Sequence, residues 1–214
     1  MELVKFISME TAPDVTRMRL IGGDLALDFI NTRSGPPLGA PVDDVLTGYA
    51  ELVAWCVHTG AFDEIAAGRA TRLARKDPAA AAEVFATALR LRDDLDAIFR
   101  ALATARQPSG KALSRLRDDE ADALAHARLE RRDSFEWSWR DDRTVGRVLR
   151  PVAHAATQLL IGDELDRIKV CGGCRFIFAD ESKNRSRRWC SMDDCGTAEK
   201  VRRYVAARRL RTSD

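Results

Sequence analysis

The sequence lacks the short motifs that mark the common enzyme families. It contains no phosphate-binding loop, no dinucleotide-binding fingerprint and no nucleophile elbow. Its only histidines, His58, His126 and His154, share no catalytic or metal-ligand spacing. We therefore expect no enzyme, but a protein that acts by binding.

Long apolar runs are also missing. The apolar stretch 25–30 contains Asp28, and no run approaches the roughly 20 residues that a membrane span needs. The first residues lack the basic region and apolar core of a secretory signal. We expect a cytoplasmic protein with no membrane partner. In that reducing compartment, clustered cysteines favour metal binding over disulfides.

Positive charge is scarce outside the C-terminal segment. Residues 171–214 hold 11 Lys and Arg against 6 Asp and Glu, a formal charge of +5, whereas residues 1–170 hold 24 against 27. The composition, with 45% hydrophobic residues, is that of an ordinary globular core. The asymmetry predicts a polyanionic partner for the C-terminal segment alone.

Helical periodicity dominates the first three quarters of the chain. The pattern predicts a helix capped by Asp43 or Asp44 and ended by Gly60, and a second helix over Asp63–Arg75. Asp77 and Pro78 begin the longest helix, because Asp is a good N-cap and Pro suits the first helical position. A more polar helix follows over about 109–126, and residues 144–161 look helical, with Pro151 kinking or dividing them.

Other segments predict short strands and loops. Met18–Ile21 reads as a short strand, 34–41 as a loop, and 25–30 as either a strand or a helical turn. Alternating aromatic residues over Phe135–Trp139 predict a half-buried strand in a hairpin. The expected fold class is α+β, with a mainly helical domain over residues 1–162 and a few short strands.

Four of the five cysteines form two pairs, Cys171/Cys174 and Cys190/Cys195. A tetrahedral site with four thiolates is closed, so the spacing predicts one structural Zn²⁺ and leaves no position for a catalytic water. A redox dithiol is the weaker reading, because it would leave the second pair unused. Cys56 lies on the apolar face of its helix and is expected in the core.

The order of elements around the cysteines predicts a small zinc finger over residues 163–214. A Cys-x-x-Cys knuckle with Gly172 and Gly173 at its turn precedes a hairpin arm at Phe176–Phe178, the second ligand pair and a helix after Cys195. This layout is treble-clef-like. On the final helix, Val201, Tyr204 and Val205 are expected to face the knuckle, while Arg202, Arg203 and Arg209 face water or a partner.

The finger is also rich in groups that bind phosphate oxygens. We assign a nucleic-acid-binding role, with DNA as the first partner, to Lys183, Arg185, Arg187, Arg188, Lys200, Arg202 and Arg203. Three alternatives stay open: a solvated loop with Trp189 packed beside the zinc, an interface for an acidic protein or a homodimer, and RNA binding with Trp189 stacked on a base.

A polar cluster lies beside the apolar segment 25–30. Asp28 and Asn31, with Arg92 of the long helix as a candidate partner for Asp28, could form a pocket for a small-molecule effector. The alternative is that Asp28 and Asn31 are satisfied structural groups that fix the N-terminal loop, because buried polar groups are normally hydrogen-bonded.

The detailed pattern around the cysteines resembles a known family. Cys171-x-x-Cys174, Phe178-x-Asp180-x-Ser182-x-Asn184-x-Ser186-Arg-Arg-Trp-Cys190 and Cys195-Gly196 resemble the CGNR zinc finger of bacterial proteins. Gly22-Gly-Asp-Leu-Ala-Leu-Asp-Phe-Ile-Asn-Thr-Arg33, with Trp55, is similar to the ABATE domain that typically precedes this finger. The resemblance implies a stress-linked bacterial transcription regulator that binds DNA through the finger.

The chain departs from this family pattern at one place. The Asn and Arg that give the CGNR finger its name are replaced by Thr197 and Ala198. The ligand Cys195 and the following glycine are kept, so the departure affects the expected nucleic-acid contacts and leaves the zinc site intact.

Overall fold

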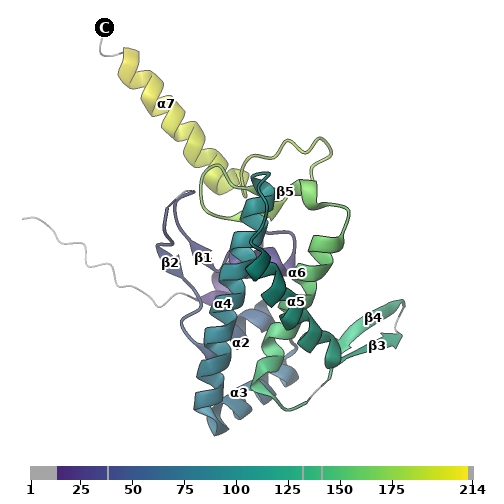
Figure 1. The fold of residues 1–214 in the computed structure, drawn as a ribbon. Coiled ribbons are helices and arrows are strands. Elements are labelled where there is room, and N and C mark those ends of the chain that lie inside the picture. Colours follow the sequence, from purple (N-terminus) through teal and green to yellow (C-terminus); the bar gives the residue numbers. More distant parts are fainter. Residues whose placement is uncertain (1–13, 38, 132, 141, 212–214) are drawn as a thin grey trace, which may run out of the picture.

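The computed structural model describes residues 14–37, 39–131, 133–140 and 142–211. They form a helical body from which a C-terminal finger and its last helix project (Figure 1). No helix in these ranges is long and apolar enough to cross a membrane. The helices are α1 (Leu25–Ile30), α2 (Tyr49–His58), α3 (Glu64–Lys76), α4 (Pro78–Ala103), α5 (Gly110–Ala125), α6 (Arg150–Ile161) and α7 (Thr197–Arg211). The strands form three antiparallel pairs: β1 (Arg33–Ser34) with β2 (Asp43–Asp44), β3 (Ala127–Arg131) with β4 (Phe135–Trp139), and β5 (Ile168–Val170) with β6 (Ile177–Ala179). The predicted α+β fold class is confirmed.

Helix α4 is the centre of the body, as its length and periodicity predict. Its first turn is capped by Asp77, whose carboxylate accepts the Ala80 N–H at 2.9 Å, and Pro78 occupies the start. Leu91, Leu95 and Phe99 lie on one stripe and are fully buried. Helices α1, α2, α3 and α5 contact α4, so its apolar stripe is covered on several sides.

The ambiguous segment 25–30 is a helix. Asp24 caps α1 by accepting the Ala26 N–H at 2.7 Å, and Phe29 packs at 5.1 Å between ring centroids against Trp55 of α2. The preceding residues Met18–Ile21 do not form the predicted strand. Their backbone instead continues into Gly22, whose carbonyl accepts the Ala179 N–H of the finger at 2.8 Å.

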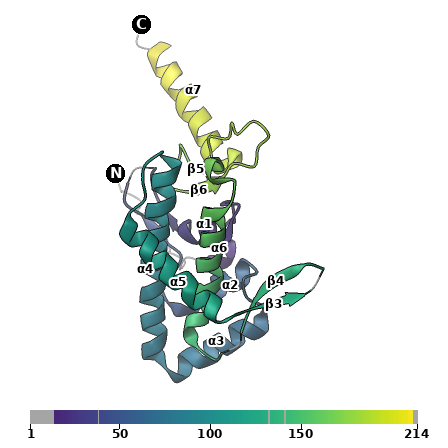
Figure 2. The ribbon, with the colours of Figure 1, turned by 45° about the vertical axis from the view of Figure 1, so that its right-hand side comes forward.

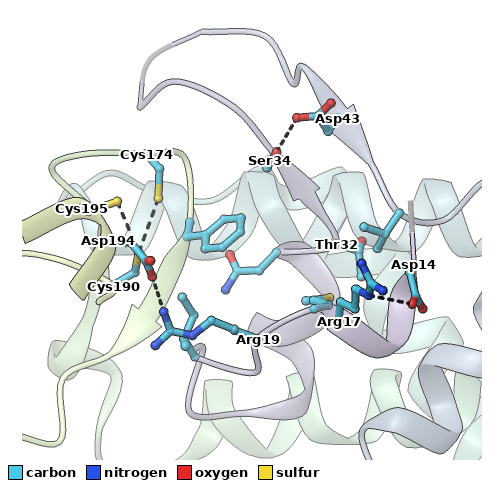
Figure 3. Close-up of a pocket in the computed structure, with 15 residues that line it drawn as sticks. Asp14, Arg17, Arg19, Thr32, Ser34, Asp43, Cys174, Cys190, Asp194 and Cys195 are labelled. Atoms are coloured by element: carbon cyan, nitrogen blue, oxygen red, sulfur yellow. Dashed lines mark hydrogen bonds and ion pairs between the residues drawn. The ribbon is translucent and has the colours of Figure 1, made fainter. Parts of the chain in front are cut away.

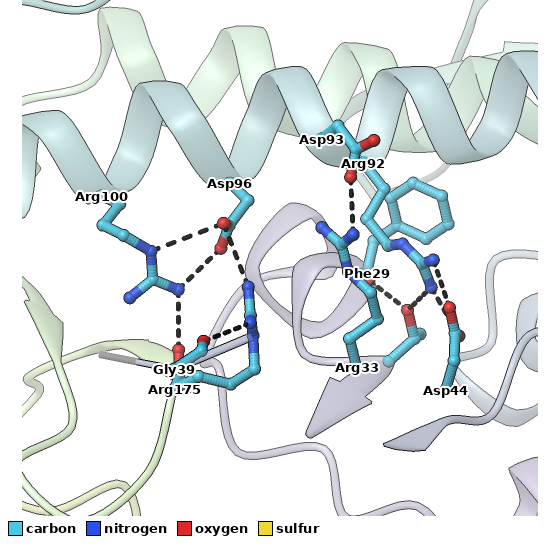
Figure 4. Close-up of polar contacts among 10 residues, drawn as sticks. Phe29, Arg33, Gly39, Asp44, Arg92, Asp93, Asp96, Arg100 and Arg175 are labelled. Carbon is cyan, nitrogen blue, oxygen red and sulfur yellow. Dashed lines mark hydrogen bonds and ion pairs between the residues drawn. The ribbon is translucent and has the colours of Figure 1, made fainter. Parts of the chain in front are cut away.

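The prediction that Asp43 or Asp44 caps a helix is wrong. Both residues form β2, and α2 begins at Tyr49 after Gly48. The cause is tertiary: Arg92 of α4 is buried and donates to both Asp44 carboxylate oxygens, at 2.8 and 2.5 Å (Figure 4). The guanidinium also donates to the Thr32 hydroxyl at 2.7 Å. Arg92 therefore joins β2 and the end of α1 to the central helix.

The hairpin at Phe135–Trp139 forms as predicted, but it is less buried than predicted. Leu129 pairs with Trp137 and Arg131 with Phe135, so these side chains share one face. The hairpin meets the body at His154 of α6, where the Trp139 and Trp137 rings lie 5.4 and 5.9 Å from the His154 ring. Phe135 is 69% exposed because the hairpin projects past the edge of the body.

Candidate metal centre

The four predicted cysteines lie together at the base of the finger. Their sulfurs all lie within 4.8 Å of one another, with Cys174–Cys190 at 3.5 Å and Cys190–Cys195 at 3.8 Å. A tetrahedron of thiolates around Zn²⁺, with Zn–S distances near 2.3 Å, has edges of about 3.8 Å. The donor set and spacing therefore fit one zinc ion, and these four residues can hold it with no ligand position left open.

Local backbone donors favour the thiolate form of the first ligand. The Cys171 sulfur accepts the N–H groups of Gly173 at 3.3 Å and Cys190 at 3.2 Å. Hydrogen bonds from the Cys174 and Cys190 thiols, together with these N–H groups, hold the pKa of Cys171 well below its usual range. Thiolate is the form that binds metal, so the knuckle is arranged for a cation.

The knuckle lies at the turn of the β5–β6 hairpin, between its strands. Neither Gly172 nor Gly173 adopts the left-handed conformation expected of a tight turn. Both glycines instead allow other parts of the finger to approach the knuckle backbone closely. A Cβ on Gly172 would lie 2.7 Å from the Trp189 ring, and one on Gly173 would lie 2.8 Å from the Cys195 Cβ.

The Arg187 side chain makes its contacts within the finger. Its Nε donates to the Trp189 carbonyl at 3.0 Å, another nitrogen donates to the Cys190 carbonyl, and the guanidinium lies 4.5 Å from the Phe178 ring centroid. These contacts hold the backbone that presents Cys190. Of the seven cations assigned to nucleic acid, Arg187 is therefore the one that the structure ties most closely to the metal site.

A buried carboxylate that sequence reasoning missed organises the loop between the ligand pairs. Asp180 is fully buried and accepts the Lys169 ammonium at 2.6 Å, the Ser182 N–H at 3.0 Å and the Arg187 N–H at 2.9 Å. Burial raises the pKa of a carboxyl, but these donors outweigh it and hold the pKa of Asp180 well below its usual range. The Asp-x-Ser spacing of 180 and 182, typical of a local Asx turn, was the available signal.

The remaining six cations lie on the loop between the ligand pairs or near the start of α7. Lys183 and Arg185 lie on the exposed loop, where Arg185 pairs with Asp166. Arg188, Lys200 and Arg203 line one shallow hollow of about 140 Å³, together with the carboxylate of Glu199, beside Trp189 and the start of α7. Arg202 and Arg203 both pair with Glu199 within the helix, at 3.3 and 2.8 Å. The fold thus brings a loop cation and two helix cations onto one surface.

The prediction that Val201, Tyr204 and Val205 pack on the knuckle is wrong. They are 55%, 67% and 40% exposed, because α7 leaves the finger and points away from the body (Figure 2). A π-helical turn, Met192–Gly196, carries Cys195 and sets this direction, and the Thr197 hydroxyl closes it by donating to the Met192 carbonyl at 3.0 Å. Arg202 and Arg203 are exposed as predicted, and the prediction for Arg209 lies outside the described side chains.

The three residues of the predicted effector pocket are separated by the fold. Asp28 accepts the Gly22 N–H at 2.8 Å and does not meet Arg92, whose guanidinium is held by Asp44 and Thr32. Asn31 instead binds the finger: its amide donates to the Ile177 carbonyl at 2.8 Å and accepts the Ile177 N–H at 2.9 Å. Of the three, only Asn31 lines the cavity between body and finger.

Body and finger share more than this contact. Ile168 and Ile177 of the β5–β6 hairpin belong to the main hydrophobic core. Arg175 donates to Asp96 of α4 at 3.3 Å, and Arg100 donates to the Arg175 carbonyl at 2.8 Å (Figure 4). The metal site is therefore held against the body by apolar packing and by several buried polar contacts.

Asp28 gives the body a pH-dependent stability. Burial raises its pKa to about 6, whereas an unfolded Asp titrates near 4, so the folded chain holds an extra proton between these values. Stability should therefore fall as pH rises from about 4 to 6. Asp28→Asn should remove this slope and add about 1–2 kcal/mol at pH 7 in urea unfolding. The exposed Asp163→Asn is the control, and an unchanged slope in Asp28→Asn would refute the assignment.

The fold and the cysteine site define a helical-body protein with a C-terminal four-cysteine zinc finger. Residues 23–163 match the model of the ABATE family, described as "Putative stress-induced transcription regulator", and residues 167–209 match the model of the CGNR zinc finger. The chain belongs to the ABATE family, and its predicted resemblance is confirmed. A search of curated proteins found no match.

Proposed function

We propose that this chain is a DNA-binding regulator that contacts nucleic acid through α7 and the loop before it, and whose body senses a ligand or partner. The observation that carries the proposal is the hollow shared by Arg188, Lys200 and Arg203 at the base of a projecting helix. Cations that converge on one surface suit phosphate oxygens.

The charge and length of α7 support this role. The helix holds six Lys and Arg and one Glu over 15 residues, which corresponds to about 22 Å. An α-helix of this width enters the major groove of duplex DNA. The four thiolates fix the start of α7 relative to Arg188, so zinc sets the geometry of the cationic surface.

The ion pairs within this surface do not oppose binding strongly. Arg185 pairs with Asp166, and Arg202 and Arg203 pair with Glu199, but all three guanidinium groups are about half exposed or more. Exposed pairs contribute about 0–1 kcal/mol, so phosphates can replace these carboxylates at little cost.

DNA affinity of the zinc-loaded chain should depend steeply on salt. Each phosphate neutralised contributes a slope of about −0.9 in a plot of log K against log salt concentration. Replacing Arg188, Lys200 and Arg203 with Gln should lower affinity and make the slope shallower by about 2–3. Fluorescence anisotropy with a labelled duplex measures both quantities.

The matched control replaces three exposed cations of the body, Arg75, Lys76 and Lys111, with Gln, which leaves the net charge equal to that of the first variant. It should keep the wild-type slope. Equal losses in the two variants would mean that only net charge acts, and no binding to any duplex at low salt would refute the proposal.

One observation favours a second candidate, a protein interface. Val201, Tyr204 and Val205 lie at helical spacing i, i+3 and i+4 and form an exposed apolar stripe on α7. Such a stripe suits a homodimer or another protein. Tyr204→Ser should then lower the molar mass measured by light scattering and leave the salt slope for DNA unchanged. RNA stacking has less support, because the Trp189 ring is occupied by Gly172 and by Arg188 at 5.5 Å.

A further inference from the structure

A cavity of about 420 Å³ lies between the body and the finger (Figure 3). Its volume falls in the range of small-molecule sites, and its surface is mostly apolar. Met18, Ile21 and Val45 of the body and Phe176 of the finger supply the apolar part. Residues of both segments therefore line this cavity.

Three zinc ligands form one wall of this cavity: Cys174, Cys190 and Cys195. Four thiolates around Zn²⁺ carry a net charge of −2, so this wall is negative when the metal is bound. A ligand in the cavity would lie against these three residues of the metal site.

The charged side chains at the rim do not neutralise that wall. Arg17 pairs with Asp14 at 3.3 Å, and Arg19 pairs with Asp194, next to Cys195. Asp43 is the rim carboxylate for which the described residues provide no cationic partner, and it accepts only the Ser34 hydroxyl at 3.1 Å. Two neutral pairs, one extra carboxylate and the thiolate centre leave the cavity with a net negative charge.

We propose that this cavity binds a small, mainly apolar molecule that carries one protonated amine. The apolar part fills the space between Met18, Val45 and Phe176, and the ammonium is attracted by Asp43 and by the zinc thiolates. The Phe176 ring adds a favourable surface for a cation. Because the walls come from both segments, the bound molecule stabilises the finger in its docked position. The inference develops the proposed ligand sensing and does not depend on DNA contact.

Three isosteric probes test the charge preference on the zinc-loaded full chain. They are 1-naphthylmethylammonium, 1-naphthalenemethanol and 1-naphthoate, followed by calorimetry and naphthyl fluorescence. An ionic contact at an effective dielectric near 20 predicts that the ammonium binds roughly tenfold or more tighter than the alcohol, and the carboxylate weakest. Equal affinities, or tightest binding of the carboxylate, would overturn the proposal.

Two variants locate the probe. Val45→Phe fills the cavity and should abolish binding, whereas Val42→Phe, at a residue 73% exposed and outside the lining, should not. Asp43→Asn should reduce the preference for ammonium over alcohol several-fold and leave alcohol binding unchanged. Circular dichroism melts check that each variant is folded. Undiminished binding in Val45→Phe would place the probe elsewhere and overturn the assignment.

Metal transfer gives an independent readout. A saturating ammonium probe should slow the loss of zinc to a coloured chelator several-fold, because it occupies the cavity that three of the four cysteines line. An unchanged rate contradicts occupation of this cavity. These measurements do not involve DNA. A negative result for the cavity therefore leaves the DNA-binding proposal untouched, and the reverse also holds.

Discussion

Cys190→Ser should reduce bound zinc from one ion per chain to almost none and should unfold the finger. Cys190 is buried, its sulfur lies within 4 Å of those of Cys174 and Cys195, and its N–H donates to the Cys171 sulfur. Structural zinc contributes about 10–16 kcal/mol of apparent binding energy to small fingers, far more than such a segment gains from its own packing. Metal analysis and the helical signal in circular dichroism measure the two effects.

The loss should extend beyond the finger. Ile168 and Ile177 contribute to the main core, so an unfolded finger exposes apolar surface of the body as well. The control is Cys56→Ala in α2, where the thiol is fully buried away from the cluster and burial raises its pKa to about 12. This variant should keep one zinc per chain, and full zinc retention in Cys190→Ser would contradict the four-thiolate site.

Asn31→Leu should destabilise the chain by about 3 kcal/mol, because it removes both hydrogen bonds to the Ile177 backbone in a buried place. An unpaired buried donor and an unpaired buried acceptor each cost about 1–3 kcal/mol, and leucine can satisfy neither. Since Ile177 follows the knuckle in β6, the same change should also weaken zinc retention. Urea unfolding and the rate of zinc transfer to a chelator report the two consequences.

Asn184→Leu serves as the matched control, since Asn184 is exposed on the loop between the ligand pairs. It should change stability by less than about 0.5 kcal/mol. If Asn31→Leu destabilised the chain but left the rate of zinc transfer unchanged, the link from the body to the metal site through Ile177 would be refuted.

Much of the fold could be predicted from local signals. Helix ends depend on residues within one or two turns of the chain, so they can be predicted without knowledge of the tertiary contacts. Examples are the cap at Asp77, the proline at position 78 and the stop at Gly60. The cysteine spacing likewise encodes a cation site, because thiolates brought together in pairs need a metal to remain close.

The errors arose where a distant residue decides the outcome. Asp44 looks like a helix cap, but the buried Arg92, 48 positions later, takes both carboxylate oxygens. Asp180 receives its ammonium from Lys169, 11 positions earlier across the β5–β6 hairpin. Sequence patterns identify such polar residues but do not assign their partners.

The sequence by itself determined the helical body, the four-cysteine centre and the concentration of positive charge near the C-terminus. These depend on periodicity, ligand spacing and composition, which are local properties of the chain. Only the tertiary structure decided that Asn31 fastens the finger to the body, that α7 points into solvent and that a cavity lies against three sulfurs. Each of these depends on how two separate segments pack, and the free energy of that packing cannot be predicted from the local pattern of either segment alone.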